Sequence, residues 1–304
     1  MLKFVIIGLG VQGNKRIKYI KKKNYITVDP FKKSDYKKIN QVPLDLYDAA
    51  IICVPDNQKL KIIEYCLKHA KHFLVEKPFP VISNKKLKQI EKLSIKKKIV
   101  SYVAYNHRFE PNIQKVKKII DSKKIGNLYY CKIFYGNGTA KLVKKSLWRD
   151  KRLGVIEDIG SHLIDILIYL FNVKKFKNYS LFFNNFENKS PDHAQFSFKE
   201  NNINFFLEMS LCMWKNTFNF DLVGSKGSVH ITSLCKWDKT VLILRKRKFP
   251  SGKPTEKKYF MKISDPTWKK EINYFSKLIR NKEYKFFLKE FIINDIFNHI
   301  RKKK

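Results

Sequence analysis

Six residues near the start of the chain, Gly8-Leu9-Gly10-Val11-Gln12-Gly13, have the spacing G-x-G-x-x-G. An apolar stretch precedes them, a helical pattern follows, and Asp29 stands 21 residues after Gly8. In such a motif the first glycine allows a tight turn, the second lets the backbone approach a pyrophosphate, and the third permits close helix–strand packing. Unpaired N–H groups at the helix start favour a phosphate. The motif predicts a dinucleotide site; the alternative is a glycine turn in an ordinary βα unit.

Asp29 also bears on the choice of dinucleotide. A carboxylate here accepts hydrogen bonds from the ribose hydroxyls and repels a 2′-phosphate, so it favours NAD over NADP. Lys32 and Lys33 follow closely in the sequence and weaken that preference, which leaves NADP as an alternative. Asp29 could also serve only as a turn residue.

A second group of polar residues lies in an otherwise apolar segment, Gly154–Phe171. On a helix Asp158, His162 and Asp165 stand at i, i+4 and i+7, so they project from one face. Polar groups on a buried helix cost free energy unless they are paired or used. They could serve a reaction, Asp158 could simply hold His162, or the carboxylate and imidazole groups could bind a metal.

The elements that must position these residues fall into two halves. Up to about residue 120, short apolar strands alternate with helical patterns, which is typical of βαβ units around a parallel sheet. The predicted strands are Phe4–Ile7, Tyr25–Val28, Ala49–Val54, His72–Val75 and Ile99–Tyr105. The predicted helices are Asn14–Lys23, Asn57–Ala70, a helix capped by Ser83, and one from Pro111 through Ile120.

Beyond about residue 125, strands joined by short polar turns predict a mostly antiparallel sheet. These strands are Asn127–Tyr135, Tyr179–Phe183, His193–Phe198, Ile203–Leu211, Thr217–Val223, Gly227–Thr232 and Thr240–Lys246. The long helix Gly154–Phe171 interrupts them, and Pro266–His299 returns to helical periodicity. We therefore expect an α/β Rossmann domain over residues 1–120. An α+β domain for substrate binding and oligomerisation would cover residues 121–304, with C-terminal helices able to pack back on the first domain.

Three further motifs follow predicted strand ends, where ligands of open α/β sheets bind. They are Val54-Pro55-Asp56-Asn57, Glu76-Lys77-Pro78 and Asn106-His107-Arg108-Phe109. In the second half, Trp148-Arg149 precedes the polar helix segment Gly154–Asp165. With the glycine motif at its start, this series resembles the Gfo/Idh/MocA family of oxidoreductases over nearly the whole chain.

The resemblance implies that Lys77, Asp158 and His162 carry or support catalysis. Lys77 would lie beside the nicotinamide and stabilise a developing alkoxide, and His162 would take the hydroxyl proton, a task that suits an ordinary imidazole. Asp158 would orient the substrate or raise the basicity of the site. The resemblance also implies a cis bond before Pro78, and it does not call for a metal.

The other site residues are assigned more broadly. The expected cofactor-binding residues are Gly8, Gly10, Val11, Gln12, Gly13, Asp29, Val54, Pro55, Asn57, Glu76, Lys77 and Asn106. The expected substrate-binding residues are Arg108, Trp148, Arg149 and Asp165. Arg108 could instead be a surface residue, and Asp165 could orient His162 or cap a neighbouring element. The family often has two or three glycines before the helix Asp, whereas this chain has Leu153-Gly154-Val155, so bulkier residues would narrow the substrate pocket.

Composition limits the other classes of function. The net charge is +38, but only eight of the 64 basic residues are Arg, and the bidentate guanidinium is the group that readers of bases and phosphates favour. The lysines are spread along the chain, so we expect no specific nucleic-acid partner. Five scattered cysteines without C-x-x-C spacing predict reduced buried thiols. The sequence shows no apolar run of the roughly 20 residues that cross a bilayer, and we expect a cytoplasmic protein with no membrane partner.

These features favour an NAD(P)-dependent oxidoreductase that transfers a hydride between nicotinamide and a secondary hydroxyl of a sugar, sugar derivative or nucleotide sugar. The alternatives are an NAD-dependent glycoside hydrolase of the same family, or a non-catalytic dinucleotide or sugar sensor. Antiparallel sheets of this size usually cover their open face, and the family commonly does so by dimerising, so we expect a homodimer or homotetramer.

Overall fold

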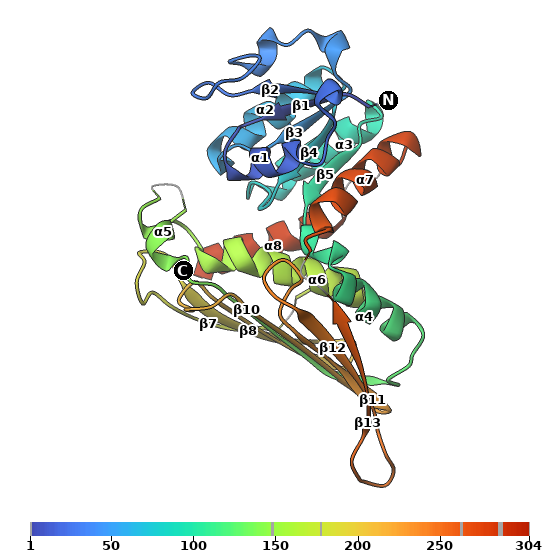
Figure 1. Cartoon of the computed structure of the whole chain (residues 1–304). Coiled ribbons are helices and arrows are strands. Elements are labelled where there is room, and N and C mark those ends of the chain that lie inside the picture. The colour runs from blue at the N-terminus through green and yellow to red at the C-terminus, as the bar shows by residue number, and fades with distance from the viewer. Residues whose placement is uncertain (1, 147–148, 177, 262–263, 285–287, 304) are drawn as a thin grey trace. The chain divides into compact units, whose positions relative to one another are not determined.

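The computed structural model describes residues 2–146, 149–176, 178–261, 264–284 and 288–303 (Figure 1). Within these residues the chain forms two compact units. Unit 1 comprises the chain up to Asn106 together with Thr267–Asn298, and unit 2 comprises His107–Pro266 and the residues after Asn298. The expected domain boundary at residue 120 stays a prediction, because contacts within each unit do not show which segments fold independently.

Unit 1 is built on a five-stranded parallel sheet with the strand order β2-β1-β3-β4-β5. Its strands are β1 (Phe4–Ile7), β2 (Tyr25–Val28), β3 (Ala49–Ile52), β4 (His72–Glu76) and β5 (Ser101–Ala104). Its helices include α1 (Val11–Ile17), α2 (Asp56–Lys68), α3 (Asn84–Lys96) and α7 (Thr267–Arg280). Short 3-10 turns lie at Lys22–Asn24, Ile39–Gln41 and Leu44–Leu46. Because all five strands are parallel, the residues that follow β1, β3, β4 and β5 meet at one edge of the sheet.

Unit 2 is built on an eight-stranded sheet with the order β13-β12-β11-β10-β6-β9-β8-β7. Neighbouring strands are antiparallel except β6 and β9, which are parallel. The strands are β6 (Leu128–Gly136), β7 (Ser180–Asn184), β8 (His193–Glu200), β9 (Ile203–Ser210), β10 (Thr217–Gly224), β11 (Gly227–Thr232), β12 (Thr240–Lys246) and β13 (Thr255–Met261). The helical elements are η4 (Asn106–Phe109), α4 (Pro111–Asp121), α5 (Ala140–Lys144), η5 (Ile156–Gly160) and α6 (Ser161–Phe171). Helix α8 (Leu288–Lys303) belongs to unit 1 up to Asn298, and the rest of it belongs to unit 2.

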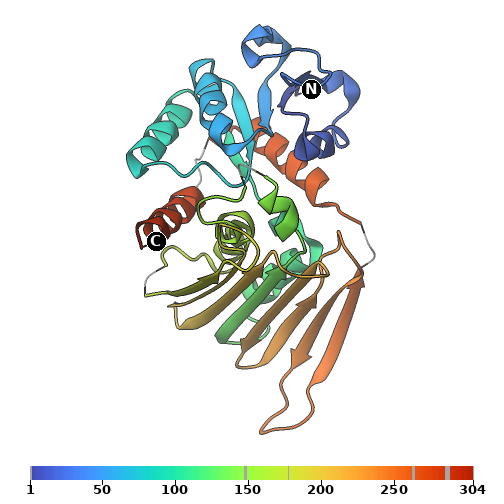
Figure 2. The ribbon, with the colours of Figure 1, turned by 90° about the vertical axis from the view of Figure 1, so that its left-hand side faces the viewer.

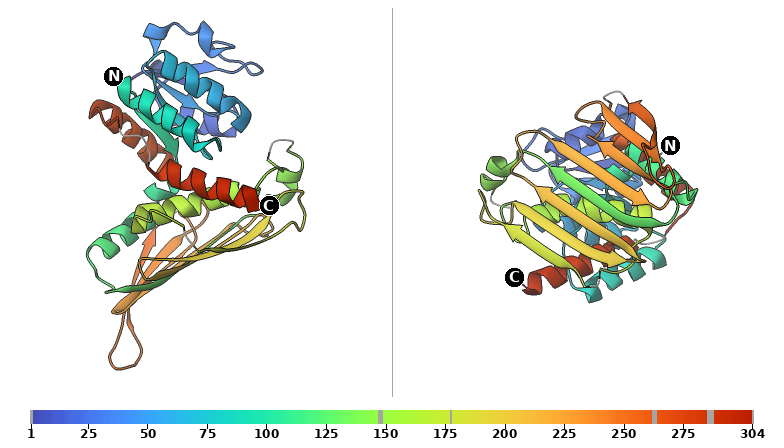
Figure 3. Two further views of the ribbon diagram at one scale, coloured as in Figure 1. Left: turned by 180° about the vertical axis from the view of Figure 1, so that it is seen from behind. Right: turned by 90° about the horizontal axis from the view of Figure 1, so that it is seen from below.

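Helices α4 and α6 cover one face of this sheet, and no element of unit 2 covers the other in the described part of the chain (Figures 1, 2 and 3). Most apolar side chains of α6 and of the turn before it are buried, whereas Ile168 and Phe171 are partly exposed. The buried ones are Ile156, Ile159, Leu163, Ile164, Ile166, Leu167 and Leu170. The packing confirms the mostly buried helix that the sequence predicts.

Most predicted elements are confirmed to within about two residues, including the Ser83 cap, whose Oγ accepts from the Lys86 N–H at 3.2 Å. The predicted helix Asn14–Lys23 is wrong in extent, because α1 spans Val11–Ile17 and its expected pattern rested on only two apolar residues. Strand β13 was not predicted, since most of its residues are exposed and give no alternating pattern. No described helix has the length and apolar character needed to cross a membrane.

The predicted helix Gly154–Phe171 is regular only from Ser161 onward. Residues Ile156–Gly160 form a π turn, and α6 continues from it to Phe171. A π turn widens the helix locally and changes the angle between side chains before and after it. Asp158 therefore does not share a regular α-helical register with His162 and Asp165, as their i, i+4 and i+7 spacing had suggested.

Candidate functional site

The glycine turn of unit 1 leaves open the position that a pyrophosphate would approach. Gly8 has φ +91°, and a Cβ there would lie 2.6 Å from the Cys53 carbonyl oxygen. A Cβ on Gly13 would overlap the Gly8 carbonyl oxygen, so this residue permits the close approach of α1 to the turn. A Cβ on Gly10 would meet no described atom within 4 Å. Two glycines are thus required by packing, and the third faces open space.

The first turn of α1 offers its N–H groups beside that space. It contains no acidic residue, Gln12 is exposed and the Val11 side chain is 72% exposed. The first N–H groups of any helix have no partner within the helix, and the helix dipole favours negative charge there. The turn therefore presents donors and no competing carboxylate to a phosphate.

Asp29 ends β2 and is held against the glycine turn. Its Oδ2 accepts from the Leu9 N–H at 2.7 Å, and its Oδ1 accepts from the N–H groups of Phe31 and Lys32 at 2.9 Å. Partial burial raises the pKa of Asp29, but these backbone hydrogen bonds and the Lys32 charge outweigh it and hold the pKa below its usual range. Asp29 is therefore an anion that acts as a turn residue, and it lies where ribose recognition was expected.

The end of β3 and the start of α2 bring a buried lysine to the Lys77–Pro78 peptide. Val54 is half-buried, whereas Pro55 and Asn57 are exposed. Lys59 is 2% exposed, and its Nζ donates to the Pro78 carbonyl oxygen and to Asp56 Oδ1, both at 2.8 Å. Burial lowers the pKa of Lys59, although the nearby Asp56 raises it.

Glu76 lies in a buried ion-pair network. Arg16 Nε and Nη2 lie 2.7 and 2.6 Å from Glu76 Oε1, and Nη2 lies 2.7 Å from Glu271 Oε2 of α7. Burial raises the pKa of Glu271 to about 7, with Glu76 raising it further and Arg16 opposing the shift. The Glu76 carboxylate was expected to bind cofactor; it is 7% exposed, and its ion pair with Arg16 anchors the backbone that leads to Lys77.

Lys77 itself is half-buried, and the Lys77–Pro78 bond is cis, as the resemblance implied. Asn106, at the end of the last strand, is 8% exposed and donates from Nδ2 to Thr267 Oγ1 at 2.9 Å. This bond ties the strand end to the start of α7. The predicted cofactor residues of unit 1 thus follow the strand ends along one sheet edge.

In unit 2, His162 of α6 contacts His107 of η4. Their Nδ1 atoms lie 2.7 Å apart, and their rings meet at 86° with centroids 4.0 Å apart. Both imidazoles are buried, with 7% and 3% exposure. On its other side, His107 Nε2 lies 3.1 Å from Lys236 Nζ, which also approaches Tyr135 Oη at 3.4 Å. His162, His107 and Lys236 therefore form a row of titratable groups.

Asp158 and Asp165 pair with two different arginines. Asp158 Oδ2 lies 2.8 Å from Arg149 Nη2, with both side chains about one-third exposed. Asp165 is buried and forms a two-point ion pair with Arg108, in which Nε lies 3.1 Å from Oδ2 and Nη2 contacts Oδ1. Burial, and then the charge of Asp158, raise the pKa of Tyr135. Arg108 is not an exposed surface residue, since its side chain is 16% exposed. The predicted Trp148 lies outside the described residues.

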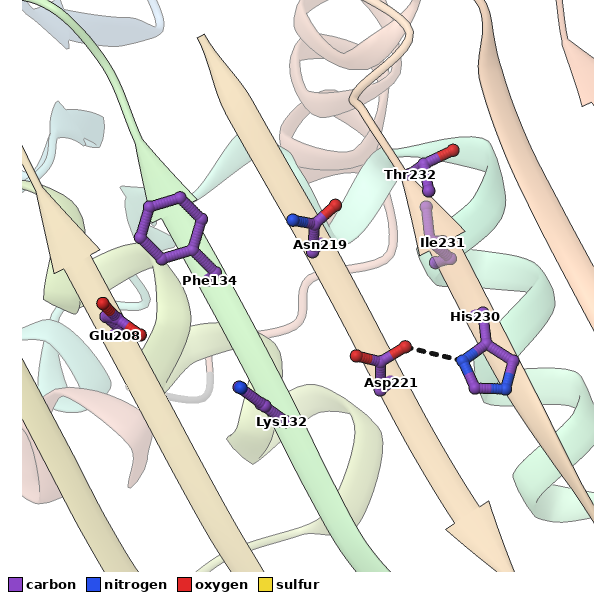
Figure 4. Close-up of a pocket in the computed structure, with 8 residues that line it drawn as sticks. All are labelled: Lys132, Phe134, Glu208, Asn219, Asp221, His230, Ile231 and Thr232. Carbon is purple, nitrogen blue, oxygen red and sulfur yellow. Dashed lines mark hydrogen bonds and ion pairs between the residues drawn. The ribbon is translucent and has the colours of Figure 1, made fainter. Parts of the chain in front are cut away.

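A separate polar hollow lies on the uncovered face of the unit 2 sheet, among the side chains drawn in Figure 4. There Asp221 Oδ1 lies 2.6 Å from His230 Nδ1, and Ser228 Oγ lies 2.8 Å from His230 Nε2. The order resembles a Ser-His-Asp triad, which also needs N–H groups for an oxyanion. Because β11 is paired on both sides, its N–H groups belong to the sheet. The arrangement therefore fits a polar surface better than a nucleophile.

Three residues that sequence reasoning missed are central to these arrangements. Arg16 could have been found, because it is one of only eight arginines and stands three positions after the buried Gly13 on the same helix face. His107 lies within a quoted motif but was given no role. Lys236 is one of many lysines, and nothing in the sequence around it indicates a role.

All five cysteines are free thiols, and no group of metal-ligating side chains occurs among the described residues.

Comparisons with known proteins agree with this architecture. Residues 113–230 match the model of the GFO/IDH/MocA C-terminal domain. An uncharacterized oxidoreductase of Schizosaccharomyces pombe is 28% identical over 140 residues, which are 45% of this chain and 37% of that protein. Glucose-6-phosphate 3-dehydrogenase of Bacillus subtilis is 27% identical over 156 residues, which are 47% of this chain and 42% of that protein. Each match thus spans well under half of the relative's length.

The likeness in structure extends over the whole chain. The solved structure of a levoglucosan dehydrogenase in complex with NADH superposes with a TM-score of 0.81 at 16% identity, and it covers 99% of this chain and 97% of that one. At this identity the likeness shows a shared fold. The segment that matches the model of the GFO/IDH/MocA C-terminal domain follows, along the chain, a parallel sheet that carries the glycine turn.

Proposed function

We propose that the chain is an NAD(P)-dependent oxidoreductase that transfers a hydride between nicotinamide and a secondary hydroxyl of a sugar, sugar derivative or nucleotide sugar. The observation that carries this proposal is the open space at Gly10. The glycines on either side of it, Gly8 and Gly13, stand where packing leaves no room for a side chain. The names of the relatives support it, since one acts on glucose 6-phosphate and a structural neighbour binds NADH. NAD is the proposed cofactor and NADP the alternative.

The proposed cofactor residues lie in unit 1. The glycine turn, Val11 and Gln12 would bind the pyrophosphate through backbone N–H groups. Asp29 would accept from the adenosine ribose with the oxygen lone pairs that its backbone bonds leave unused. The residues at the ends of β3, β4 and β5 would line the rest of the dinucleotide; they are Val54, Pro55, Asn57, Glu76, Lys77 and Asn106. Glu76 would act indirectly, because Arg16 holds its carboxylate.

A bound nicotinamide supplies the acceptor or donor of the hydride. We propose that Lys77 stabilises negative charge on the reacting oxygen and that His162 takes or gives the hydroxyl proton. Asp158, held by Arg149, would orient the substrate hydroxyls. Arg108, Asp165, Arg149 and Trp148 remain the proposed substrate residues, with Asp165 fixing the Arg108 guanidinium.

The proposal extends to location and assembly. We propose a cytoplasmic protein that forms a homodimer or homotetramer through the uncovered face of the unit 2 sheet. That face carries the polar hollow with Asp221 and His230, so its contacts would include hydrogen bonds as well as apolar packing. No specific nucleic-acid partner is proposed.

Turnover tests the proposal directly. Purified protein is incubated with NAD or NADP and a panel of sugars, sugar phosphates and nucleotide sugars while nicotinamide absorbance is followed. We expect turnover with at least one substrate, and its loss by at least about a hundredfold in Lys77→Ala and His162→Ala. Absence of turnover across the panel, with calorimetric binding of dinucleotide retained, would support the sensor alternative. Product formation without net change in nicotinamide absorbance would support the hydrolase.

A further inference from the structure

We propose that His107 and Lys236 set the position of the proton on His162, so that the protonation of Lys236 decides whether His162 is ready to donate or to accept a proton. This inference rests on the proposed function and assigns roles in it to two residues for which the sequence predicts none. His107 and Lys236 act through His162, so both are positioning residues. All three groups belong to unit 2, and the contacts between them are short.

The contact between the two imidazoles contains one proton. A 2.7 Å separation of Nδ1 atoms is a hydrogen bond, in which one nitrogen must carry the proton and the other must offer a lone pair. Because both Nδ1 atoms are committed to this bond, each ring keeps only Nε2 for other partners. The Nε2 of His107 faces Lys236, and the proposed function assigns the Nε2 of His162 to the substrate oxygen.

The charge of Lys236 fixes which ring donates. As an ammonium, Lys236 can only donate, so His107 Nε2 must accept and His107 must carry its proton on Nδ1. His107 then donates to His162 Nδ1, and a neutral His162 carries its proton on Nε2. In this form His162 can give a proton to a carbonyl oxygen, which is the requirement of reduction.

The opposite form serves oxidation. When Lys236 is a neutral amine it can accept from His107 Nε2–H, which lets His162 Nδ1 donate to His107 Nδ1 and leaves His162 Nε2 basic. As the hydride leaves carbon for the nicotinamide, the hydroxyl proton passes to His162 Nε2. The Nδ1 proton passes to His107, and the Nε2 proton of His107 passes to Lys236. The alcohol becomes a carbonyl, Lys236 becomes an ammonium, and neither imidazole becomes charged.

The groups around this row favour the ammonium at neutral pH. An ordinary lysine is charged there. Glu110 is an acidic group near it: burial raises the pKa of Glu110, hydrogen bonds from Cys235 lower it, Asp265 raises it, and Lys236 lowers it. On the His162 side, Asp158 acts on the Tyr135 hydroxyl and is paired with Arg149, while Asp165 is paired with Arg108. The Lys236 ammonium also lies 4.5 Å from the centroid of the Trp237 ring. The resting form is therefore the one that is ready for reduction.

Nitrogen NMR of the histidine rings tests the inference without any turnover. The full-length protein is labelled with ¹⁵N-histidine, and the two rings are assigned from His107→Asn and His162→Asn spectra. At neutral pH we expect a proton on Nδ1 of His107 and on Nε2 of His162. Lys236→Arg should keep this pattern, because a guanidinium is a permanent donor. Lys236→Glu should move protons to His107 Nε2 and His162 Nδ1, because a carboxylate can only accept. A protonated His107 Nε2 in the unaltered protein, or no change in Lys236→Glu, would overturn the inference.

The pH dependence of the two directions gives a second readout. Oxidation should rise with pH as Lys236 loses its proton, and reduction should fall over the same range. In Lys236→Arg we expect reduction within about threefold of the unaltered protein, and oxidation without the rise. Lys239→Met, which removes an exposed lysine of the same segment, should leave both profiles unchanged. Identical profiles for Lys236→Arg and the unaltered protein would contradict the inference. If no substrate is turned over, the proposed function fails, whereas the NMR result still decides where the protons lie.

Discussion

Unit 1 and unit 2 each contain a group of proposed functional residues, and the two groups differ in how they are built. In unit 1 the dinucleotide turn is made of backbone, with Gly8 and Gly13 fixed by carbonyl oxygens that leave no room for a side chain. In unit 2 the cluster is made of side chains that come from η4, α6 and the segment before β12, and hydrogen bonds join them. A backbone site needs particular residues at fixed spacing, whereas a side-chain site needs only that distant segments meet.

The largest effect is expected from a substitution that distorts the glycine turn of unit 1. Gly13→Ala places a Cβ against the Gly8 carbonyl oxygen, so the turn must move. We expect a loss of dinucleotide affinity of at least about a hundredfold, with a clear fall in melting temperature. Gly10→Ala is the matched control, because its Cβ meets open space: the melting temperature should stay the same while affinity falls about tenfold. Calorimetry and thermal unfolding measure both; equal melting temperatures for the two variants would contradict the packing argument.

The next largest effect is expected from the buried ion pairs of Arg16 in the same unit. Arg16→Met leaves Glu76 and Glu271 buried without their cation, which should cost about 3–5 kcal/mol of unfolding free energy. The measurement is denaturant unfolding. Arg280→Met removes an exposed arginine from the same helix as Glu271 and should cost less than about 0.5 kcal/mol. Similar losses in both variants would show that Arg16 does not neutralise the two carboxylates.

A smaller effect follows from the raised pKa of Glu271. Burial lifts this pKa from 4.5 to about 7, so the folded chain holds a proton there that the unfolded chain releases. The stability from this group is present below pH 4.5 and is lost as the pH rises toward 7. We expect unfolding free energy to fall across that window, and Glu271→Gln to flatten the slope. A slope that is unchanged in Glu271→Gln would place the titrating group elsewhere.

The difference between a backbone turn and a side-chain cluster also explains what the sequence could predict. The parallel sheet, the order of its strands in the chain and the glycine turn follow from local patterns, because each βα unit repeats the same period and ends in the same kind of turn. Ser83 and Pro111 were correctly placed as helix starts for the same reason. Strand β13 was missed, because most of its residues are exposed and the sequence shows no alternating apolar pattern there.

The side-chain site could be predicted only in part. His162 and Asp165 were found because polar groups stand out on an apolar helix. Their partners were not, because His107 and Lys236 lie 55 and 74 residues from His162 along the chain, and spacing carries no information about such a meeting. The π turn at Ile156–Gly160 shifted the register between Asp158 and His162, and a regular helical projection could not anticipate it.

The preference of the glycine turn for NAD or NADP provides a further test of the proposed dinucleotide site. Lys32 Nζ donates to the Leu9 carbonyl oxygen at 2.8 Å, which fixes a cation beside the Asp29 carboxylate. This charge should offset the repulsion of a 2′-phosphate. Lys32→Ala should weaken NADP binding about tenfold and NAD binding by less than about threefold, because only NADP carries the extra phosphate. Lys38→Ala, an exposed lysine of the same loop, is the control; equal losses for both dinucleotides would place the 2′ position away from Lys32.

The smallest expected changes in stability come from two exposed ion pairs, of which we expect one to affect turnover and the other not. Arg149 and Asp158 are each about one-third exposed, and so are Arg245 and Glu256 on the uncovered sheet face. Exposed pairs contribute about 0–1 kcal/mol, so Arg149→Met and Arg245→Met should both change unfolding free energy by less than that. Of these two arginines, Arg149 is the one that holds a carboxylate assigned to the substrate, and we expect Arg149→Met to lower kcat/KM about tenfold while Arg245→Met leaves it unchanged. Because the two pairs match in exposure and charge, a difference in turnover would have to come from where each pair lies. Equal turnover in the two variants would mean that Asp158 does not depend on Arg149 for its position.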